Sequence, residues 1–510
     1  MSTPVPPRRR LRHRIPTSLR QHWKLPVAFI AFVAVVATVF GSTRVRPYIT
    51  GDATIIASEI TRNVTGTVDL FDASVTHELS IEIGDAEYDD MISAFRKNGD
   101  KKWINASVVI DGTRIDDAAV RLKGNSTLMG LRGESPSEGF APPDGMEPPG
   151  GMQPPPGMEP PEGMQPPEGM QPPAGFEVPG GFDPGQGPPG MGGTTQVIPD
   201  DPTSLPLLIS FDENVEGRAY QGMTELSVRP GSPVLNEAMA LSLTAETGQP
   251  TQRYAYTVYS VNDSSSTTRL VLEHPDAGYA DSLFDSDGYL YKADASSRFE
   301  YIGDDQSDYA DQFTQINATD SGTLQPIIDF LKWLDSADAA EFDAHLADRV
   351  DVDSFARYVA TQNLLVNTDD MSGPGQNYYL WYDLGTEKLS VISWDLNLAM
   401  QGDATVGPHD TLTMGPGGMP GGGDGESGGP RGGNTLKTRF LASDAFASLY
   451  EDAYRDLFEQ IYGSGRALDV LDEVAASVPT SDGLTAEALQ QSVDSMRSWI
   501  EQRILSGHDL

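Results

Sequence analysis

The most informative part of the sequence, residues 351–397, reads DVDSFARYVATQNLLVNTDDMSGPGQNYYLWYDLGTEKLSVISWDLN. Within Asp351–Asn367, apolar side chains recur mostly three, four and seven residues apart, which predicts an amphipathic helix. A polar loop, 368–375, follows this helix. Residues 377–382 and 389–394 are rich in aromatic and β-branched side chains and flank a turn, which predicts a β-hairpin.

Three side chains with oxygen donors stand at the base of this hairpin. Asp395 ends the second strand, and a hairpin returns to where it began, so we expect Asp395 near Asp369 and Asn377. Carboxylate and amide oxygens suit Mg²⁺ or Mn²⁺. Their order parallels a protein kinase, in which one Asp orients the acceptor hydroxyl and a later amide and Asp hold metal. The spacing also fits a solvated acidic loop beside an ordinary strand-terminal Asp.

Strand patterns dominate the chain before this stretch, and helical patterns dominate after it. Strands are predicted at His77–Ile83, Ile104–Asp111, Ala118–Lys123, Arg253–Val261, Arg269–Glu273 and Gly288–Ala293. Helices are predicted at Leu324–Leu334 and at roughly 441–463, 466–477 and 484–506. The predicted fold class is therefore α+β, with a β-rich front half and an α-rich back half that contains one hairpin.

Two segments rich in Gly and Pro, 137–203 and 407–434, interrupt this pattern. The first repeats Gly-Met-Glu/Gln-Pro-Pro, and its methionines stand six residues apart from Met146 to Met170. In polyproline II, with a rise of about 3.1 Å per residue, these side chains share one face roughly 19 Å apart, too far for two thioethers to bind one copper ion. A disordered insertion and a partner-docking arm both fit this composition.

The composition excludes several classes of function. The 510 residues include 74 acids, 35 bases and no cysteine, and the net charge is −39. This acidity argues against nucleic-acid binding by counterion release. The absence of cysteine excludes disulfides, thiolate metal sites and cysteine nucleophiles. No P-loop or His-Glu-x-x-His motif occurs, and we expect His77 and His274 to be ordinary strand-end residues.

The amino-terminal end carries the pattern of a membrane anchor. Seven Lys and Arg residues within 8–24 precede the uncharged run Leu25–Gly41, which is at the short end of the length that spans a bilayer. The basic flank predicts a cytoplasmic tail over 1–24, a single-pass anchor in the cell membrane, and an extracellular remainder, 42–510. That remainder begins with a tether over 42–66. A cleaved signal peptide and a buried core helix are the alternatives.

Six short segments, in this order, resemble the CotH family, that is, spore-coat protein H and its relatives: Val120–Thr127 (VRLKGNST), Gly288–Ala293 (GYLYKA), Asp351–Phe355 (DVDSF), Asn367–Asp370 (NTDD), Asn377–Leu380 (NYYL) and Ile392–Asp395 (ISWD). The resemblance covers about 67–505. It implies an atypical bilobal protein-kinase-like fold, with a β-rich N-lobe over 67–323 and a helical C-lobe over 324–510. It also implies Mg²⁺-dependent transfer of the ATP γ-phosphate to Ser or Thr of a surface or coat protein.

The resemblance also implies roles for individual residues around the hairpin. Asp369 matches the catalytic Asp, and Asp370 is the alternative one residue later. Asp395 matches the metal-binding Asp, and Asn377 is a second metal ligand. Members of the family usually have another acid where this chain has Asn397.

Three residues of the front half are candidates for contact with the nucleotide. Glu273 stands where a kinase-like Glu would pair with a lysine, and Lys292 or Lys123 would then contact phosphate. Each of these charges also fits an ordinary strand surface. The basic pair that usually follows the Lys-Gly-Asn-Ser segment is replaced here by Leu205–Leu208.

Two other functions compete with a kinase. A surface adhesion or scaffold protein on the same fold would need no catalysis. A glycosidase would need two carboxyl groups about 5–9.5 Å apart in a sugar cleft.

Overall fold

The computed structural model describes residues 60–124, 127–128, 131, 197–319, 322–410, 412–414, 420–422 and 434–507. The predicted tail 1–24, the anchor 25–41 and most of the tether 42–66 lie outside these residues, as do most of 137–203 and much of 407–434. No helix in the described part is both long and apolar enough to cross a membrane.

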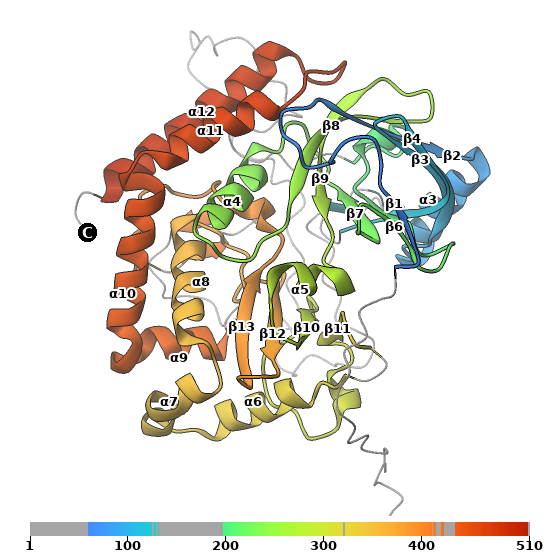
Figure 1. Cartoon of the computed structure of the whole chain (residues 1–510). Coiled ribbons are helices and arrows are strands. Elements are labelled where there is room, and N and C mark those ends of the chain that lie inside the picture. Colours follow the sequence, from blue (N-terminus) through green and yellow to red (C-terminus); the bar gives the residue numbers. More distant parts are fainter. Residues whose placement is uncertain are drawn as a thin grey trace, which may run out of the picture. The chain divides into compact units, whose positions relative to one another are not determined.

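Seven strands from the front half close into a barrel (Figure 1). Their order is β2–β3–β4–β5–β7–β9–β8, and β2 pairs with β8 in parallel while the other neighbours are antiparallel. Alternate side chains of β2 and β3 are buried in the barrel core, as a period of two requires. The bounds are β2 His77–Ile83, β3 Ile104–Ile110, β4 Thr113–Leu122, β5 Leu207–Ser210, β7 Glu225–Val228, β8 Tyr254–Val261 and β9 Thr267–Glu273.

Smaller elements accompany the barrel. Helix α3 (Asp85–Asn98) packs three apolar side chains into the barrel core. Strand β1 (Arg62–Val64) pairs in parallel with β6 (Arg218–Tyr220). The end of the insertion predicted over 137–203 is folded, because Thr203 in the 3₁₀ helix η3 (Pro202–Ser204) is buried and accepts a hydrogen bond from Arg269 of β9.

A second sheet has the order β11–β10–β12–β13 and is antiparallel throughout. The predicted hairpin is its β12 (Tyr378–Asp383) and β13 (Lys388–Ser393). Strands β10 (Gly288–Ala293) and β11 (Phe313–Gln315) join this hairpin. The sequence assigned 288–293 to the front half, but this strand belongs to the second sheet and not to the barrel.

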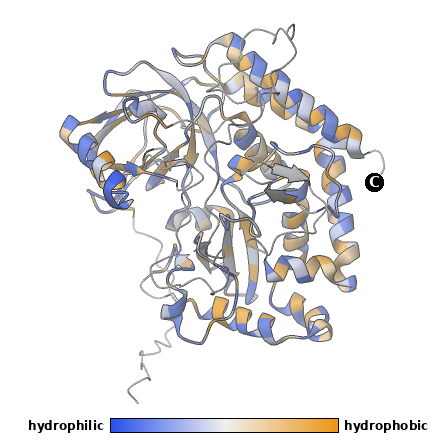
Figure 2. Ribbon diagram, turned by 180° about the vertical axis from the view of Figure 1, so that it is seen from behind, coloured by the Kyte–Doolittle hydropathy of each residue, from blue (hydrophilic) through white to orange (hydrophobic). Residues whose placement is uncertain are grey.

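Helices lie beside the second sheet and predominate toward the carboxyl end of the chain (Figure 1). Helix α8 (Val352–Leu364) contacts β13 and α10, and Asp351 caps it by accepting from the Ser354 N–H at 3.0 Å. The long helices near the carboxyl end carry both hydrophobic and hydrophilic residues (Figure 2). The bounds are α5 Ala277–Leu283, α6 Gln325–Ser336, α7 Ala339–His345, α9 Thr435–Ala442, α10 Asp444–Phe458, α11 Arg466–Ser477 and α12 Ala486–Ser506. Short elements are η4 Gln306–Tyr309, η5 Leu346–Asp348, η6 Leu396–Leu398, the π-helix η7 Glu459–Gly463, β14 Leu412–Met414 and β15 Pro420–Gly422.

Helix α4 (Leu235–Glu246) is the element that the sequence missed with the greatest consequence. It lies between β7 and β8 along the chain and contacts α11, α12 and η6. Its residues 238–241 are all buried, so the helix lacks the polar face from which periodicity is recognised. It shares one hydrophobic core with Leu270 and Leu272 of β9 and with the helices of the back half.

The α+β fold class is confirmed.

A buried arginine fixes the carboxyl-terminal helix α12. Arg503 is 1% exposed and donates to the backbone carbonyls of Asn363, Leu364, Ala404 and Val406 and to the Tyr454 hydroxyl. These acceptors include the end of α8 and the segment that follows the hairpin. Arg503 therefore ties both to α12.

Replacing Arg503 by Met is expected to lower the free energy of unfolding by about 2–4 kcal/mol, because several buried carbonyls lose their donor. Arg497→Met on the same helix removes only a partly exposed ion pair with Asp472 and should cost less than about 1 kcal/mol. Denaturant unfolding of both variants measures the difference. Equal losses would contradict the structural role of Arg503.

Candidate active site

The loop between α8 and β12 holds Asp369 in a fixed orientation. Its Oδ1 accepts from the Gly375 N–H at 2.6 Å, and its Oδ2 accepts from the Asn377 side-chain amide at 2.9 Å. A Cβ at Gly375 would lie 2.5 Å from Oδ2, so a residue with a side chain does not fit there without displacing Asp369. Burial raises the pKa of Asp369 to about 6, with the charges of Asp395 and Asp370 adding to the effect against these two hydrogen bonds.

Asp370, the alternative catalytic candidate, forms an ion pair instead of binding the amides that hold Asp369. Its carboxylate is buried, pairs with the Lys437 ammonium of α9, and accepts from the Ser372 N–H at 2.8 Å. The two neighbouring acids are therefore in different environments. Asp369 is held by amides at the base of the hairpin, whereas Asp370 ties the loop to α9.

Asp395 follows β13 in the left-handed backbone region, with φ 53°. Its Oδ1 accepts from Nη2 of Arg229 at 2.6 Å, and the same nitrogen donates to Glu237 Oε1. Arg229 follows β7 of the barrel, and Glu237 lies in the first turn of α4. A buried cation thus joins the barrel, α4 and the end of the hairpin.

The hairpin brings the predicted residues together. Tyr378 pairs with Ser393, so Asn377 and Asp395 lie near the same end of the hairpin. Asn377 binds Asp369 directly, and Asp395 is close enough for its charge to raise the pKa of Asp369. The expected juxtaposition of these three side chains is present, and their roles stay predictions.

Lys123 approaches Asp395 from the end of β4. Its ammonium donates to the Ser227 hydroxyl, lies 3.1 Å from Nδ1 of His274, and sits 4.9 Å from the centre of the Trp394 ring. Burial lowers the pKa of Lys123 well below its ordinary value, the charge of Arg229 adds to this, and Asp395 opposes it. Trp394 directly precedes Asp395, so this lysine packs against the hairpin end.

Lys292 and His274 are two other basic residues near Lys123. Lys292 lies on β10, and its ammonium has no hydrogen bond or ion pair within the described residues, but its charge lowers the pKa values of Lys123 and His274. His274 was expected to be an ordinary strand-end residue. Instead it lies between Lys123 and Glu225, with 3.5 Å from its Nε2 to the Glu225 carboxylate, and burial followed by the charge of Lys123 lowers its pKa.

Glu273 does not pair with a lysine, contrary to the expectation. It lies opposite Arg253 at the end of the β8–β9 pairing and binds that guanidinium at 2.6 and 3.1 Å. Glu237, which is also buried, is the glutamate that shares a cation with Asp395, and that cation is Arg229. Neither residue was predicted from the sequence, although a basic residue after a strand and a glutamate in the first turn of a helix are the signals that mark them.

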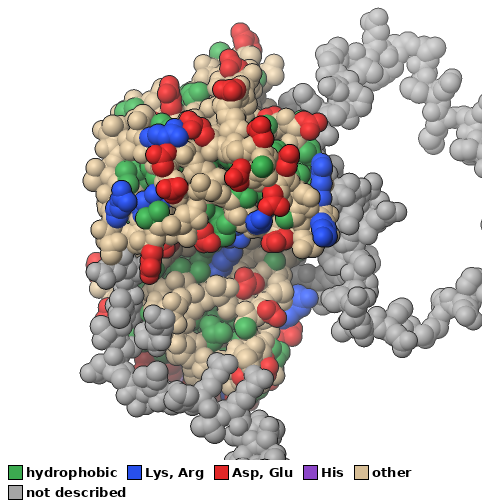
Figure 3. All heavy atoms as spheres, turned by 90° about the vertical axis from the view of Figure 1, so that its right-hand side faces the viewer, with side chains coloured by type: hydrophobic (Ala, Val, Ile, Leu, Met, Phe, Trp, Pro, Cys, Tyr) green, Lys and Arg blue, Asp and Glu red, His purple; other side chains and the backbone are tan. Residues whose placement is uncertain are grey.

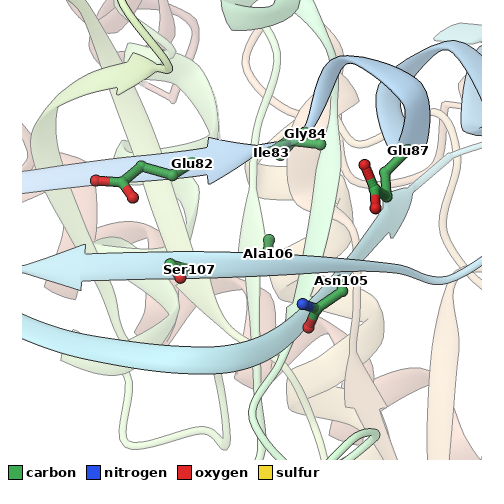
Figure 4. A pocket seen from close by; sticks show the side chains of 7 residues that line it. All are labelled: Glu82, Ile83, Gly84, Glu87, Asn105, Ala106 and Ser107. Atoms are coloured by element: carbon green, nitrogen blue, oxygen red, sulfur yellow. The ribbon is translucent and has the colours of Figure 1, made fainter.

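One hollow of the barrel lies away from these residues. It is about 300 Å³ in volume and is lined by β2, β3 and the start of α3, including Glu82, Glu87 and Asn105 (Figure 4). It contains two carboxylates and no basic side chain, so it does not suit an anionic nucleotide.

The family model described as CotH kinase protein matches residues 209–505, more than half of the chain. The chain belongs to the CotH kinase family. The matched range contains Arg229, Glu237, Asp369, Asn377 and Asp395. It begins after Lys123, so the expected resemblance over about 67–505 is shown only from 209 onward.

Other comparisons add little to the family assignment. No curated protein matches this CotH kinase family member. A solved structure from Shewanella oneidensis MR-1, the complex of the toxin–antitoxin system HipA, HipB and its operator DNA, contains a similar chain at 10% identity and a TM-score of 0.28. The alignment covers 55% of the present chain and 57% of that chain.

Proposed function

We propose that the chain is a Mg²⁺-dependent protein kinase that transfers the γ-phosphate of ATP to Ser or Thr of a surface or coat protein. The observation that carries the proposal is the meeting of Asp369 and Asp395 at the hairpin base with Lys123 and Arg229 from the barrel. The barrel would be the N-lobe and the second sheet with its helices the C-lobe of a bilobal kinase-like fold. The nucleotide would bind between these cations and the hairpin.

The donor set fits a metal that is shared with phosphates. Within the described residues no group of three or more His, Asp or Glu side chains could hold a metal alone. Mg²⁺ does not need one, because it usually takes one or two carboxylates, substrate phosphates and water. Asp395 would hold the metal through its carboxylate and Asn377 through its amide oxygen, since the Asn377 nitrogen is already used toward Asp369. A bound Mg²⁺ would supply charge neutralisation at the transferring phosphoryl group.

Asp369 would act on the acceptor. Its carboxylate would orient the Ser or Thr hydroxyl and receive its proton while the hydroxyl oxygen bonds to the γ-phosphorus and the bond to the leaving ADP oxygen breaks. The raised pKa of Asp369 suits a group that accepts a proton. Lys123, with Lys292 as the alternative, would stabilise the negative charge of the phosphates.

The test is transfer of label from γ-labelled ATP to a panel of Ser- and Thr-containing proteins, with and without Mg²⁺, using Asp369→Ala as the control variant. Label that depends on both Mg²⁺ and Asp369 supports a kinase. If the folded wild-type protein neither transfers label nor binds nucleotide, the alternative of a non-catalytic adhesion or scaffold protein takes its place.

Acidic side chains are spread over the face in Figure 3 without a continuous basic patch, so we propose no nucleic-acid partner.

We also propose that residues 25–41 anchor the protein in the cell membrane, with residues 42–510 outside. The basic flank over 8–24 supports this orientation. Protease added to intact cells is expected to digest the extracellular part, and membrane extraction is expected to require detergent. Full protection of residues 42–510 in intact cells, with digestion after lysis, would contradict the orientation.

A further inference from the structure

Arg229 lies between Glu237 and Asp395, a position that neither Lys123 nor Lys292 occupies. Its Nη2 donates to Glu237 and to Asp395, which links a helix glutamate to the proposed metal-binding carboxylate. Glu237 is 1% exposed, so the pair is almost fully buried. Two carboxylates around one guanidinium raise the pKa of Arg229 against the effect of its burial, and the arginine stays charged.

The Arg229 guanidinium also has N–H groups that lack an acceptor. Its Nε is buried without a hydrogen-bond partner, and no hydrogen bond of Nη1 is found in the described part of the chain. An unfilled donor on a buried charged group is costly, and most such groups in proteins have partners. A guanidinium is a planar fork of donors that matches the oxygens of a phosphate or a carboxylate.

The other basic residues of the site lack this arrangement. Lys123 is engaged by Ser227 and His274 and has no hydrogen-bonded carboxylate among the described residues. Lys292 has no anchoring partner there, and Glu273 is taken by Arg253. Arg229 alone, within the described residues, binds both a glutamate of a neighbouring helix and Asp395.

We propose that Arg229 is a phosphate-contacting residue of the nucleotide site and that Glu237 of α4 holds its guanidinium in place. The inference rests on the proposed kinase function. Arg229, held by Glu237, would then take the phosphate-contacting role that was predicted for Lys123 or Lys292. Because α4 packs against α11 and η6, the position of this cation also depends on the packing of that helix.

Calorimetric titration of Arg229→Met with Mg-ADP, Mg-ATP and adenosine tests the proposal. Loss of a charge-assisted hydrogen bond should weaken binding of both phosphorylated ligands about 10- to 100-fold and leave adenosine binding within about twofold. Arg229→Lys keeps the charge and should recover part of the affinity. Glu237→Gln should weaken Mg-ATP in the same direction by a smaller factor.

Arg269→Met is the matched control, since Arg269 is also a buried arginine of the barrel, but its guanidinium binds, among the described residues, only the backbone carbonyls of Thr203 and Gly231. It should lower the melting temperature and keep the affinity for Mg-ATP. The inference fails if folded Arg229→Met binds Mg-ATP like wild type, or if it loses adenosine and Mg-ATP equally, as a general structural defect would cause. If wild type binds no nucleotide, the proposed function itself fails, and the inference fails with it.

Discussion

Asp369→Asn is expected to slow phosphate transfer about 10²- to 10⁴-fold, the usual contribution of a general base, while Mg-ATP affinity changes by less than about twofold. Asn keeps the shape and the hydrogen bond to the Gly375 N–H but cannot receive a proton. Its second atom would be an NH₂ group that no longer accepts from the Asn377 amide, but Asn377 keeps its orientation because its nitrogen also donates to the Asp369 backbone carbonyl at 3.1 Å. Initial rates with labelled ATP and calorimetry on the same preparation measure the two quantities.

Two further Asp→Asn variants make this result interpretable. Asp353→Asn, on the exposed side of α8, removes the same charge far from the proposed chemistry and should leave the rate unchanged. Asp370→Asn leaves the Lys437 ammonium without its partner and should chiefly lower stability. An active Asp369→Asn beside a folded but inactive Asp370→Asn would transfer the catalytic role to Asp370.

Asp395→Asn is expected to weaken Mg-ATP binding by more than about a hundredfold, because loss of a direct metal ligand should exceed the 10- to 100-fold cost of losing an outer contact. In the absence of Mg²⁺, the affinity for ATP should change far less. The same carboxylate also neutralises Arg229, so a modest rise in metal-free ATP affinity is the expected direction. Titrations with and without EDTA measure both effects, and equal losses in the two would show that Asp395 does not act through metal.

Local pattern was sufficient to predict the elements of the hairpin region. The helix, the loop and both strands of residues 351–397 were found because periodicities of 3.6 and 2 are properties of neighbouring residues. Helix α8 ends at Leu364, three residues before the predicted end, because Val366 adopts a left-handed conformation with φ 49°. The meeting of Asp369, Asn377 and Asp395 followed from the return of a hairpin to its start.

The features that could not be predicted from the sequence depend on contacts between distant residues. Helix α4 is buried on several sides and shows no polar face, so the residue that it contributes, Glu237, was not recognised. Glu273 was assigned to a lysine, but the antiparallel register of β8 and β9 places Arg253 opposite it. Strand β10 was assigned to the front half, since nothing in GYLYKA specifies which sheet it joins.

A crystal structure with Mg²⁺ and a non-hydrolysable ATP analogue tests directly whether the hairpin base holds a metal–nucleotide complex. We expect a metal on the Asp395 carboxylate at about 2.0–2.1 Å, as Mg²⁺ requires, with the terminal phosphate facing Asp369. We also expect a phosphate oxygen on the Arg229 guanidinium. An analogue bound at saturating concentration anywhere else on the protein, with Asp395 still paired only to Arg229, would contradict a nucleotide site at the hairpin base.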